Sequence, residues 1–206
     1  MAQRRIALFG GTFDPIHSGH TRVADAAAKQ IGAEKVVFIP AKHSPLKEFL
    51  PHASDVDRLR MTALAIAGND CFSVSHCELE RPVPSYTLDT IRQFRRDYGP
   101  ETSLHWLLGA DSIAEVVYWY KIQELIDECN LTTMQRPGYA PDFDRFEPLW
   151  GRERVAKLKR NVVQTPLIDI SSTEVRRRLA AGENVSGMVH PGVIQYIREH
   201  DLYRKT

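Results

Sequence analysis

Residues 5–20 read Arg5-Ile6-Ala7-Leu8-Phe9-Gly10-Gly11-Thr12-Phe13-Asp14-Pro15-Ile16-His17-Ser18-Gly19-His20, an apolar run followed by two glycines and two histidines. The run 5–9 predicts a buried strand, and the glycines predict a tight turn after it. Residues 19–31 repeat their apolar side chains at helical spacing, which predicts a helix. A strand, a turn and a helix in this order begin a βαβ unit, so this stretch favours a parallel sheet.

The rest of the chain repeats this alternation of short apolar runs and helical patterns. The expected strands are Arg5–Phe9, Val36–Ile39, Phe72–Val74, Leu104–Leu108, Leu131–Met134 and Val162–Thr165. The expected helices are Gly19–Ile31, Val56–Ala67, Leu88–Tyr98, Ile113–Glu128, Arg152–Lys159, Glu174–Ala181 and Gly192–His200. An irregularity is expected around Trp119-Tyr120, and Pro137–Pro148 is expected to be a loop. We therefore predict an α/β fold over residues 1–206 as a single domain: a doubly wound, Rossmann-like parallel sheet with helices on both faces and a small C-terminal helical part over residues 171–206. Ligands of such sheets bind beyond the carboxyl ends of the strands.

The composition excludes functions that depend on a strong electric field. The chain has 206 residues, with 27 Lys and Arg against 26 Asp and Glu, and a formal net charge of +1. This balance predicts neither a nucleic-acid partner nor a membrane partner. The three cysteines form no C-x-x-C pair, and the N-terminal residues lack the pattern of a secretion signal. We expect a cytoplasmic protein with reduced thiols in its core.

The loop after the first strand is a candidate anion site. Gly10 and Gly11 would let the backbone approach a ligand closely, and the following helix would offer unpaired amides at the positive end of its dipole. His17 and His20 lie three residues apart, so their rings can point to the same side, and Gly19 would leave room for a phosphate. A phosphate site fits these features best, although the histidines could also be zinc ligands or plain surface residues.

A second candidate anion site begins at residue 171. Ser171-Ser172-Thr173 before a helical pattern is typical of a helix N-terminus, with hydroxyls and amides at the positive end of the dipole. Arg176 lies one turn further on and could reach a phosphate held there. The alternative is an ordinary capped helix whose arginines form a solvated basic face. This alternative explains Arg177 and Arg178 better than it explains Arg176. Two such sites suit a triphosphate whose α-phosphorus lies between them.

These two segments resemble the two signatures of the nucleotidylyltransferase superfamily. Residues 10–20 contain its H-x-G-H core, and residues 170–176 match its I-S-S-T-x-x-R motif. The middle of the chain resembles the nicotinate-nucleotide adenylyltransferases of bacterial NAD synthesis. The segments that match this branch are Ser85–Thr90, Gly109–Ser112, Trp119–Lys121, Arg136–Tyr139 and His200–Tyr203.

The resemblance implies a reaction in which the adenylyl group of ATP passes to nicotinate mononucleotide, giving nicotinate adenine dinucleotide and pyrophosphate. It implies that the phosphates are bound by His17, His20, Lys47 and Arg176. It also implies ATP contacts from Gly10, Gly11, Thr12, Phe13, Gly109, Asp111, Ser171, Ser172 and Thr173. Mg²⁺ would arrive with ATP, without a metal site built by the protein. The partners would be the two nucleotides, and a homo-oligomer is compatible with the sequence.

The resemblance further implies a pocket for the nicotinate ring. Thr87 and Tyr120 match positions whose backbone amides receive the nicotinate carboxylate, and Trp119 and Arg136 match other contacts of the mononucleotide. An indole stacks well on a cationic pyridinium ring, although Trp119 could instead be a core residue of an amphipathic helix. Asp111 could be a helix N-cap in place of a nucleotide contact.

One departure from the family pattern affects the second loop. Leu46 stands where the family usually has a histidine before its basic residue, here Lys47, and His43 could replace that histidine. Two other functions stay open at this point. The chain could be another adenylyltransferase of the superfamily, acting on pantetheine phosphate or nicotinamide mononucleotide, or a non-catalytic nucleotide-binding protein.

Overall fold

The computed structural model describes residues 3–43, 45–46, 49–135, 137–138 and 140–204. Six strands form one parallel sheet in the order β3-β2-β1-β4-β5-β6. They are β1 (Arg5–Gly11), β2 (Lys35–Pro40), β3 (Phe72–Val74), β4 (Ser103–Gly109), β5 (Asn130–Gln135) and β6 (Val162–Gln164). The order reverses between β1 and β4, as it does in doubly wound dinucleotide-binding sheets. The predicted Rossmann-like α/β class is therefore confirmed.

The chain forms two compact units. Unit 1 consists of Met1–Gly10, Val23–Val37 and Tyr86–Leu167, and unit 2 consists of Gly11–Arg22, Phe38–Ser85 and Ile168–Thr206. The helix α1 (Ser18–Ile31) and the strand β2 contribute residues to both units. The two sequence motifs with the histidines and with Arg176 fall within unit 2, apart from Gly10, which ends the first segment of unit 1.

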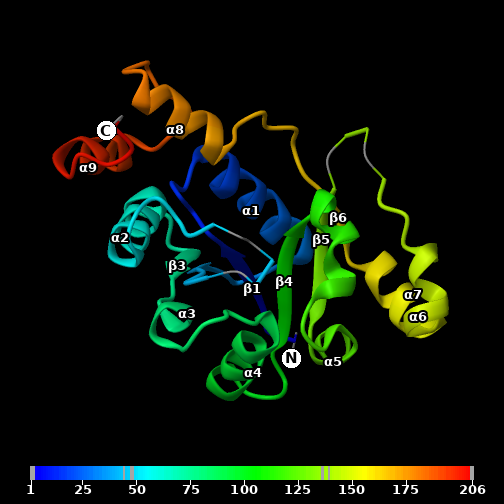
Figure 1. The fold of residues 1–206 in the computed structure, drawn as a ribbon. Helices are drawn as coiled ribbons and strands as arrows, with labels where there is room; N and C mark the ends of the chain where they lie inside the picture. The colour runs from blue at the N-terminus through cyan, green and yellow to red at the C-terminus, as the bar shows by residue number, and fades with distance from the viewer. Residues whose placement is uncertain (1–2, 44, 47–48, 136, 139, 205–206) are drawn as a thin grey trace. The chain divides into compact units, whose positions relative to one another are not determined.

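Unit 1 contains β4, β5 and β6, most of β1 and part of β2; β4 pairs in parallel with β1 and β5, and β5 pairs in parallel with β6 (Figure 1). Its helices are α4 (Thr87–Tyr98), η1 (Ala110–Ala114), η2 (Val116–Tyr118), α5 (Ile122–Glu128), η3 (Asp144–Phe146), α6 (Glu147–Trp150) and α7 (Arg152–Arg160). Residues 6–8 of β1 are fully buried, which explains why this strand is a continuous apolar run. Leu88, Ile91 and Phe94 on α4 are buried, as the helical pattern predicts.

Unit 2 contains α2 (Asp55–Ile66), β3, α3 (Cys77–Glu80), α8 (Ser172–Ala180) and α9 (Pro191–Glu199). The helices α2 and α9 pack against each other, and the hydroxyl of Tyr196 donates a hydrogen bond to Asp57 at 2.9 Å. The start of α2 is capped by Ser54, whose Oγ accepts from the backbone N–H of Asp57. This contact and the cap fix α2 in the unit.

The buried face of α2 differs from the expected one. The pattern predicts that Leu59, Ala63, Ile66 and Ala67 face inward, but the buried residues are Arg58, Met61, Thr62 and Ile66. Arg58 is fully buried because its Nη1 donates to the carbonyl oxygens of Thr12 and Ala41, at 2.7 Å each. A polar residue with such partners is invisible to a hydrophobic pattern, so the prediction of this face is right for Ile66 and wrong for the other three positions.

The irregularity expected around Trp119-Tyr120 is confirmed, but the rest of the helix expected over Ile113–Glu128 is only partly found. The structure has the short turns η1 and η2, then Trp119–Lys121 without helical structure, and then α5. Lys121 has a φ of 49°, in the left-handed region, so a right-handed helix cannot run through it. In the expected loop Pro137–Pro148, η3 and α6 begin, because Phe146 and Trp150 are buried and stack with ring centres 4.4 Å apart.

Two further observations concern the expected environment. Cys77 and Cys129 are buried and Cys71 is exposed, so the prediction of core cysteines holds for two of the three. Across the residues described here, no helix has the length and apolar character needed to cross a membrane.

Candidate active site

The two glycines that end β1 leave space for neighbouring rings. A Cβ on Gly10 would lie 2.3 Å from Cζ2 of Trp106, and a Cβ on Gly11 would lie 2.8 Å from Cε1 of Phe13. Both glycines belong to the strand and neither has a positive φ. The tight turn expected at these positions is therefore wrong, and the packing of Trp106 and Phe13 explains why a side chain is missing there.

His17 and His20 lie at the start of α1 with their rings stacked, 3.7 Å apart between centres and 26° between planes. The prediction that the rings point to the same side is confirmed. Nδ1 of His20 accepts a hydrogen bond from the backbone N–H of His17 at 3.2 Å. A neutral His20 therefore carries its proton on Nε2, which makes this atom a donor. The ring of Phe13 packs edge-on against His20, with centres 5.1 Å apart.

The side chain of His17 is buried. Only 7% of its surface is exposed, and burial lowers its pKa to about 4, so the ring is neutral near pH 7. Its Nδ1 is buried without a hydrogen-bond partner in the described structure. A Cβ on Gly19 would lie 2.8 Å from this atom. Gly19 thus makes room for the imidazole of His17, whereas the sequence predicts room for a phosphate.

Fewer amides are unpaired at the start of α1 than the sequence predicts. The backbone N–H of Ser18 donates to the carbonyl of Met188 at 2.8 Å, and that of His17 is used by His20. The hydroxyl of Ser18 donates to the carbonyls of Gly187 and Met188. The segment before α9 therefore fixes this turn, and the two imidazoles are the main polar groups that the turn presents.

Asp14 is a buried carboxylate that joins several segments of unit 2. Its Oδ1 accepts from the hydroxyl of Tyr203 at 2.6 Å and from Ala53 N at 3.1 Å. Its Oδ2 accepts from His52 N at 2.7 Å and lies 3.3 Å from Nδ1 of His52. Burial acts to raise the pKa of Asp14, but these hydrogen bonds and the charge of Arg176 outweigh it and hold the pKa below its usual 3.8. Asp14 is therefore ionised at neutral pH.

The helix α8 begins as the sequence predicts. The Oγ of Ser171 accepts from the backbone N–H of Glu174 at 3.1 Å, which is an N-cap. The hydroxyl of Ser172 donates to the carbonyl of Pro15 at 2.9 Å. Thr173 accepts a hydrogen bond from the guanidinium of the arginine three residues further on. The second motif is therefore attached directly to the loop that carries the first.

The three consecutive arginines of α8 have different environments. Nη1 of Arg176 donates to the backbone carbonyl of Asp14 at 2.6 Å. Arg177 and Arg178 instead pair with Glu174 at 2.8 and 2.7 Å, on the more exposed side of the helix. The two guanidinium groups lower the pKa of Glu174 to about 2. The prediction that Arg177 and Arg178 form a solvated face, and Arg176 does not, is confirmed.

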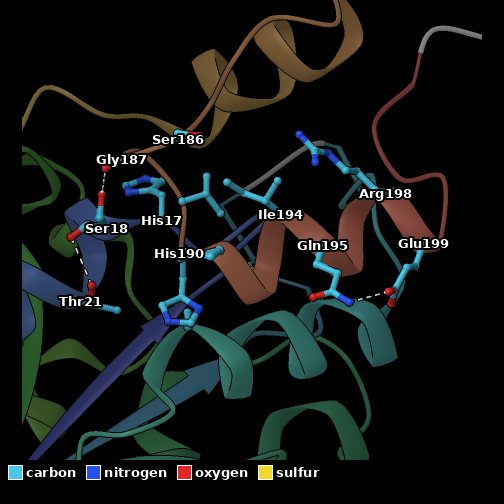
Figure 2. A pocket seen from close by; sticks show the side chains of 13 residues that line it. His17, Ser18, Thr21, Ser186, Gly187, His190, Ile194, Gln195, Arg198 and Glu199 are labelled. Atoms are coloured by element: carbon cyan, nitrogen blue, oxygen red, sulfur yellow. Dashed lines mark hydrogen bonds between the residues drawn. The ribbon is translucent and has the colours of Figure 1, made fainter.

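A cavity of about 810 Å³ opens beside His17 (Figure 2). Its walls come from the start of α1, from α2, from residues 186–191 and from α9, where Gln195 donates to Glu199. Its lining includes His17 but does not include His20, Arg176 or residues 171–173. The cavity therefore reaches His17 from the side of α9 and is not lined by α8.

In unit 1, the start of α4 contacts Tyr120 although the two are far apart in sequence. Thr87 opens α4, so its amide is one of the first-turn donors of that helix. The ring of Tyr86, at the N-cap, stacks on Tyr120 with centres 4.4 Å apart. Trp119 is half-buried and has an extended backbone between η2 and α5, so the alternative of a core tryptophan inside a helix is wrong.

Gly109 and Asp111 follow one another at the end of β4. A Cβ on Gly109 would lie 2.9 Å from Oδ1 of Asp111, so only a glycine lets this carboxylate fold back toward the strand. The alternative that Asp111 is a helix N-cap is wrong, because η1 begins at Ala110 and Gly109 occupies the N-cap position. Asp111 itself is exposed.

Two of the predicted site residues, Lys47 and Arg136, lie outside the described residues. Of the second loop, Leu46 is 42% exposed, and the carbonyl of His43 accepts from Ser85 N at 3.0 Å. Among the described residues, no group of three or more His, Cys, Asp and Glu side chains is arranged to hold a metal ion.

Sequence reasoning gave no site role to three residues that organise this region. They are Asp14 and Tyr203, which bind each other, and Arg58, which holds the backbone of Thr12. Asp14 and Tyr203 lie inside segments that match the family, and this match is the one indication in the sequence that they matter. Their pairing spans 189 residues, and no local pattern predicts such a contact.

Comparisons with known proteins agree with the fold and the motifs. The Cytidylyltransferase-like family model matches residues 8–178. A "Probable nicotinate-nucleotide adenylyltransferase" from Moorella thermoacetica is 38% identical over 97% of this chain and 92% of the relative. One from Neisseria meningitidis serogroup B is 40% identical over 98% of this chain and 100% of the relative. The solved Plasmodium falciparum nicotinic acid mononucleotide adenylyltransferase, complexed with NaAD, has the same fold, with a TM-score of 0.73 at 21% identity over 97% of each chain.

The parallel sheet and the two joined motifs are those of a nucleotidyltransferase of the cytidylyltransferase-like family. The relatives that match nearly the whole chain define a narrower family within this class. The chain belongs to the nicotinate-nucleotide adenylyltransferases.

Proposed function

We propose that this chain transfers the adenylyl group of ATP to nicotinate mononucleotide in NAD biosynthesis. A phosphate oxygen of the mononucleotide attacks the α-phosphorus of ATP, the bond from that phosphorus to the bridging oxygen of the β-phosphate breaks, and pyrophosphate leaves with that oxygen. The observation that carries the proposal is the attachment of α8 to the H-x-G-H loop. It brings the guanidinium of Arg176 to the backbone of the loop that carries His17 and His20.

In this proposal the protein supplies position and charge, and no residue acts as a nucleophile. The attacking group is already an anion, so catalysis consists of aligning it and stabilising the charge of the transition state and of pyrophosphate. His20 donates from Nε2 to a phosphate oxygen, since its Nδ1 is used by His17. Arg176, and Lys47 by family resemblance, balance the negative charge.

The environment of His17 supports a role that changes when ATP binds. The ring is neutral in the protein alone because burial lowers its pKa to about 4. A phosphate beside it would favour the protonated ring, because opposite charges attract strongly where little water is present. His17 would then be protonated more often than in the protein alone, which favours the negative charge of pyrophosphate.

The nicotinate end is proposed to lie in unit 1. The amide of Thr87, in the first turn of α4, and the backbone at Tyr120 would donate to the carboxylate, and Trp119 would stack on the pyridinium ring. Arg136 is assigned to the mononucleotide by resemblance. The remaining proposed contacts belong to ATP: Gly10, Gly11, Thr12, Phe13, Gly109, Asp111, Ser171, Ser172 and Thr173.

Mg²⁺ is proposed to enter as part of the ATP substrate. Asp14, the buried acid of the first motif, already accepts hydrogen bonds from protein donors on both of its oxygens, so we do not assign it as a metal ligand. We further propose that the chain acts as one catalytic domain in the cytoplasm, since the family match spans both units. A homo-oligomer is compatible with this account.

A substrate panel tests the proposal. ATP or CTP is mixed with nicotinate mononucleotide, nicotinamide mononucleotide or pantetheine phosphate, and pyrophosphate release and product mass are measured. We expect nicotinate adenine dinucleotide from ATP and nicotinate mononucleotide, with kcat/KM at least about 100-fold above that for the amide. A carboxylate can accept hydrogen bonds from two backbone amides of the protein. A carboxamide has only one oxygen, so one of these backbone amides would face the N–H₂ group of the ligand and lose its acceptor. Pyrophosphate release with none of the pairs would contradict catalysis, and a preference for pantetheine phosphate would contradict the substrate.

A further inference from the structure

The carboxylate of Asp14 is satisfied by donors that lie outside its own motif. Oδ1 accepts from the Tyr203 hydroxyl and from Ala53 N, and Oδ2 accepts from His52 N. Nη1 of Arg176 lies 3.9 Å from Oδ2 and donates instead to the backbone carbonyl of Asp14, at 2.6 Å. The buried charge is therefore met by polar donors, and Arg176 forms no close ion pair with it.

This arrangement matters because a carboxylate competes with a phosphate for the same arginine. A close arginine–carboxylate pair is one of the strongest polar contacts in proteins. A buried carboxylate that loses a donor must find another partner, since leaving it unpaired is costly. Arg176 is a guanidinium already 3.9 Å from Oδ2, so it would move onto Oδ1 or Oδ2 and become less available to a phosphate.

We propose that Tyr203 is a positioning residue for adenylyl transfer: its hydroxyl satisfies Asp14 and thereby leaves Arg176 for the phosphates of ATP. The inference rests on the proposed function, in which Arg176 contacts ATP. Tyr203 comes from the segment after α9 and reaches Oδ1 at 2.6 Å. Burial and the charge of Asp14 both raise the pKa of Tyr203 above its usual value, so the hydroxyl stays protonated and donates throughout the neutral range.

The substitution Tyr203→Phe removes the hydroxyl and keeps the ring. We expect kcat/KM for ATP to fall roughly tenfold, since the lost hydrogen bond goes to a charged group whose charge then captures Arg176. Tyr196→Phe is the matched control. It removes a tyrosine hydroxyl that donates to Asp57 at 2.9 Å, also in the C-terminal part of unit 2, and it does not touch Arg176. Thermal unfolding of both variants establishes that they fold.

A double-mutant cycle separates positioning from a merely structural role. Tyr203→Phe is made in the wild-type chain and in Arg176→Ala. The proposal predicts a roughly tenfold loss in the first background and less than about twofold in the second, because Tyr203 acts through Arg176. An equal loss in both backgrounds, or an equal loss from Tyr196→Phe, would overturn this inference alone. An Arg176→Ala variant with normal kcat/KM would overturn the role of Arg176 in the proposed function, and the inference with it.

Discussion

The two candidate binding regions are held in place by different kinds of contact. In unit 2, hydrogen bonds fix the polar groups: His17 N–H fixes the ring of His20, and the carbonyl of Asp14 fixes Arg176. In unit 1, Tyr120 is 43% exposed, and its ring stacks on a neighbouring tyrosine. The first region sets donors before any substrate arrives, whereas the second presents aromatic surfaces that can adjust.

This difference leads to different kinetic roles. Donors held in advance stabilise a transition state most, because they need no reorganisation when charge develops. An exposed ring that stacks on a substrate binds the ground state and the transition state about equally, which changes KM more than kcat. We therefore expect substitutions in unit 2 to lower kcat and substitutions at the nicotinate end to raise KM.

The largest effect is expected for His20. His20→Ala should lower kcat at least about 100-fold, because a donor to the developing charge is lost. Alanine also removes the acceptor for the N–H of His17, so His20→Asn is the better variant: its carbonyl can still accept that bond. Circular dichroism and thermal unfolding should show an intact fold for both. Near-normal turnover in His20→Asn would remove this residue from the mechanism.

The next effect separates neighbouring arginines on one helix. Arg176→Ala should lower kcat/KM for ATP roughly 30-fold or more, as expected for loss of a charged hydrogen-bond donor to phosphate. Arg177→Ala should change it less than about twofold, because Arg177 pairs with Glu174 and Glu183 on the exposed side, where ion pairs contribute little. Steady-state rates at varied ATP decide between them. Similar losses in the two variants would show that general charge, and not position, matters.

A smaller effect is expected for the nicotinate end. Trp119→Ala should raise KM for nicotinate mononucleotide about 10- to 20-fold, which is the size expected for a lost stack on a cationic ring. The ring stacks on the acid and on the amide alike, so the ratio of kcat/KM between the two mononucleotides should stay constant. A change confined to kcat would contradict the division between the two regions.

The smallest effect concerns two buried histidines, one in each unit. Burial lowers the pKa of His17 to about 4, and burial with the charges of Arg5 and Lys157 lowers that of His105 to about 4. In NMR titrations, ATP should raise the pKa of His17 by about one pH unit and leave that of His105 unchanged, since only His17 is proposed to meet phosphate. Equal shifts at both, or none at His17, would count against a phosphate beside His17.

The same two histidines set the sign of a pH effect on stability. Both have a folded pKa below the ordinary 6.5, so the unfolded chain binds protons more readily between pH 4 and 6.5. Their contribution to stability is complete above pH 6.5 and declines as the pH falls toward 4. Urea unfolding at several pH values checks this direction, and His17→Asn should reduce the slope.

The sequence predicts the strands and the N-cap well because both depend on local signals. The β-branched run before Pro40 and the Ser171 cap each lie within a few residues of the feature that they define. The sequence predicts an irregularity around Trp119-Tyr120 but not its extent, because the left-handed φ of Lys121 and the two short turns before it have no pattern of their own.

The least predictable features depend on partners far away in the chain. Gly10 is small because Trp106 fills the space of its side chain, and Gly19 is small because the ring of His17 does so. Motif matching marks these glycines as important but does not reveal these packing partners. The sequence assigns no role to Asp14, because its role depends on Tyr203 near the other end of the chain.

One measurement tests the division between the two regions most directly. It is the ratio of kcat/KM for nicotinate over nicotinamide mononucleotide, determined with ATP for the wild-type chain and for His20→Asn. The account predicts a ratio of at least about 100 in both proteins, while the variant loses at least about 100-fold in kcat with each substrate. A ratio near one in the wild-type chain, or a ratio that collapses when His20 is replaced, would contradict it.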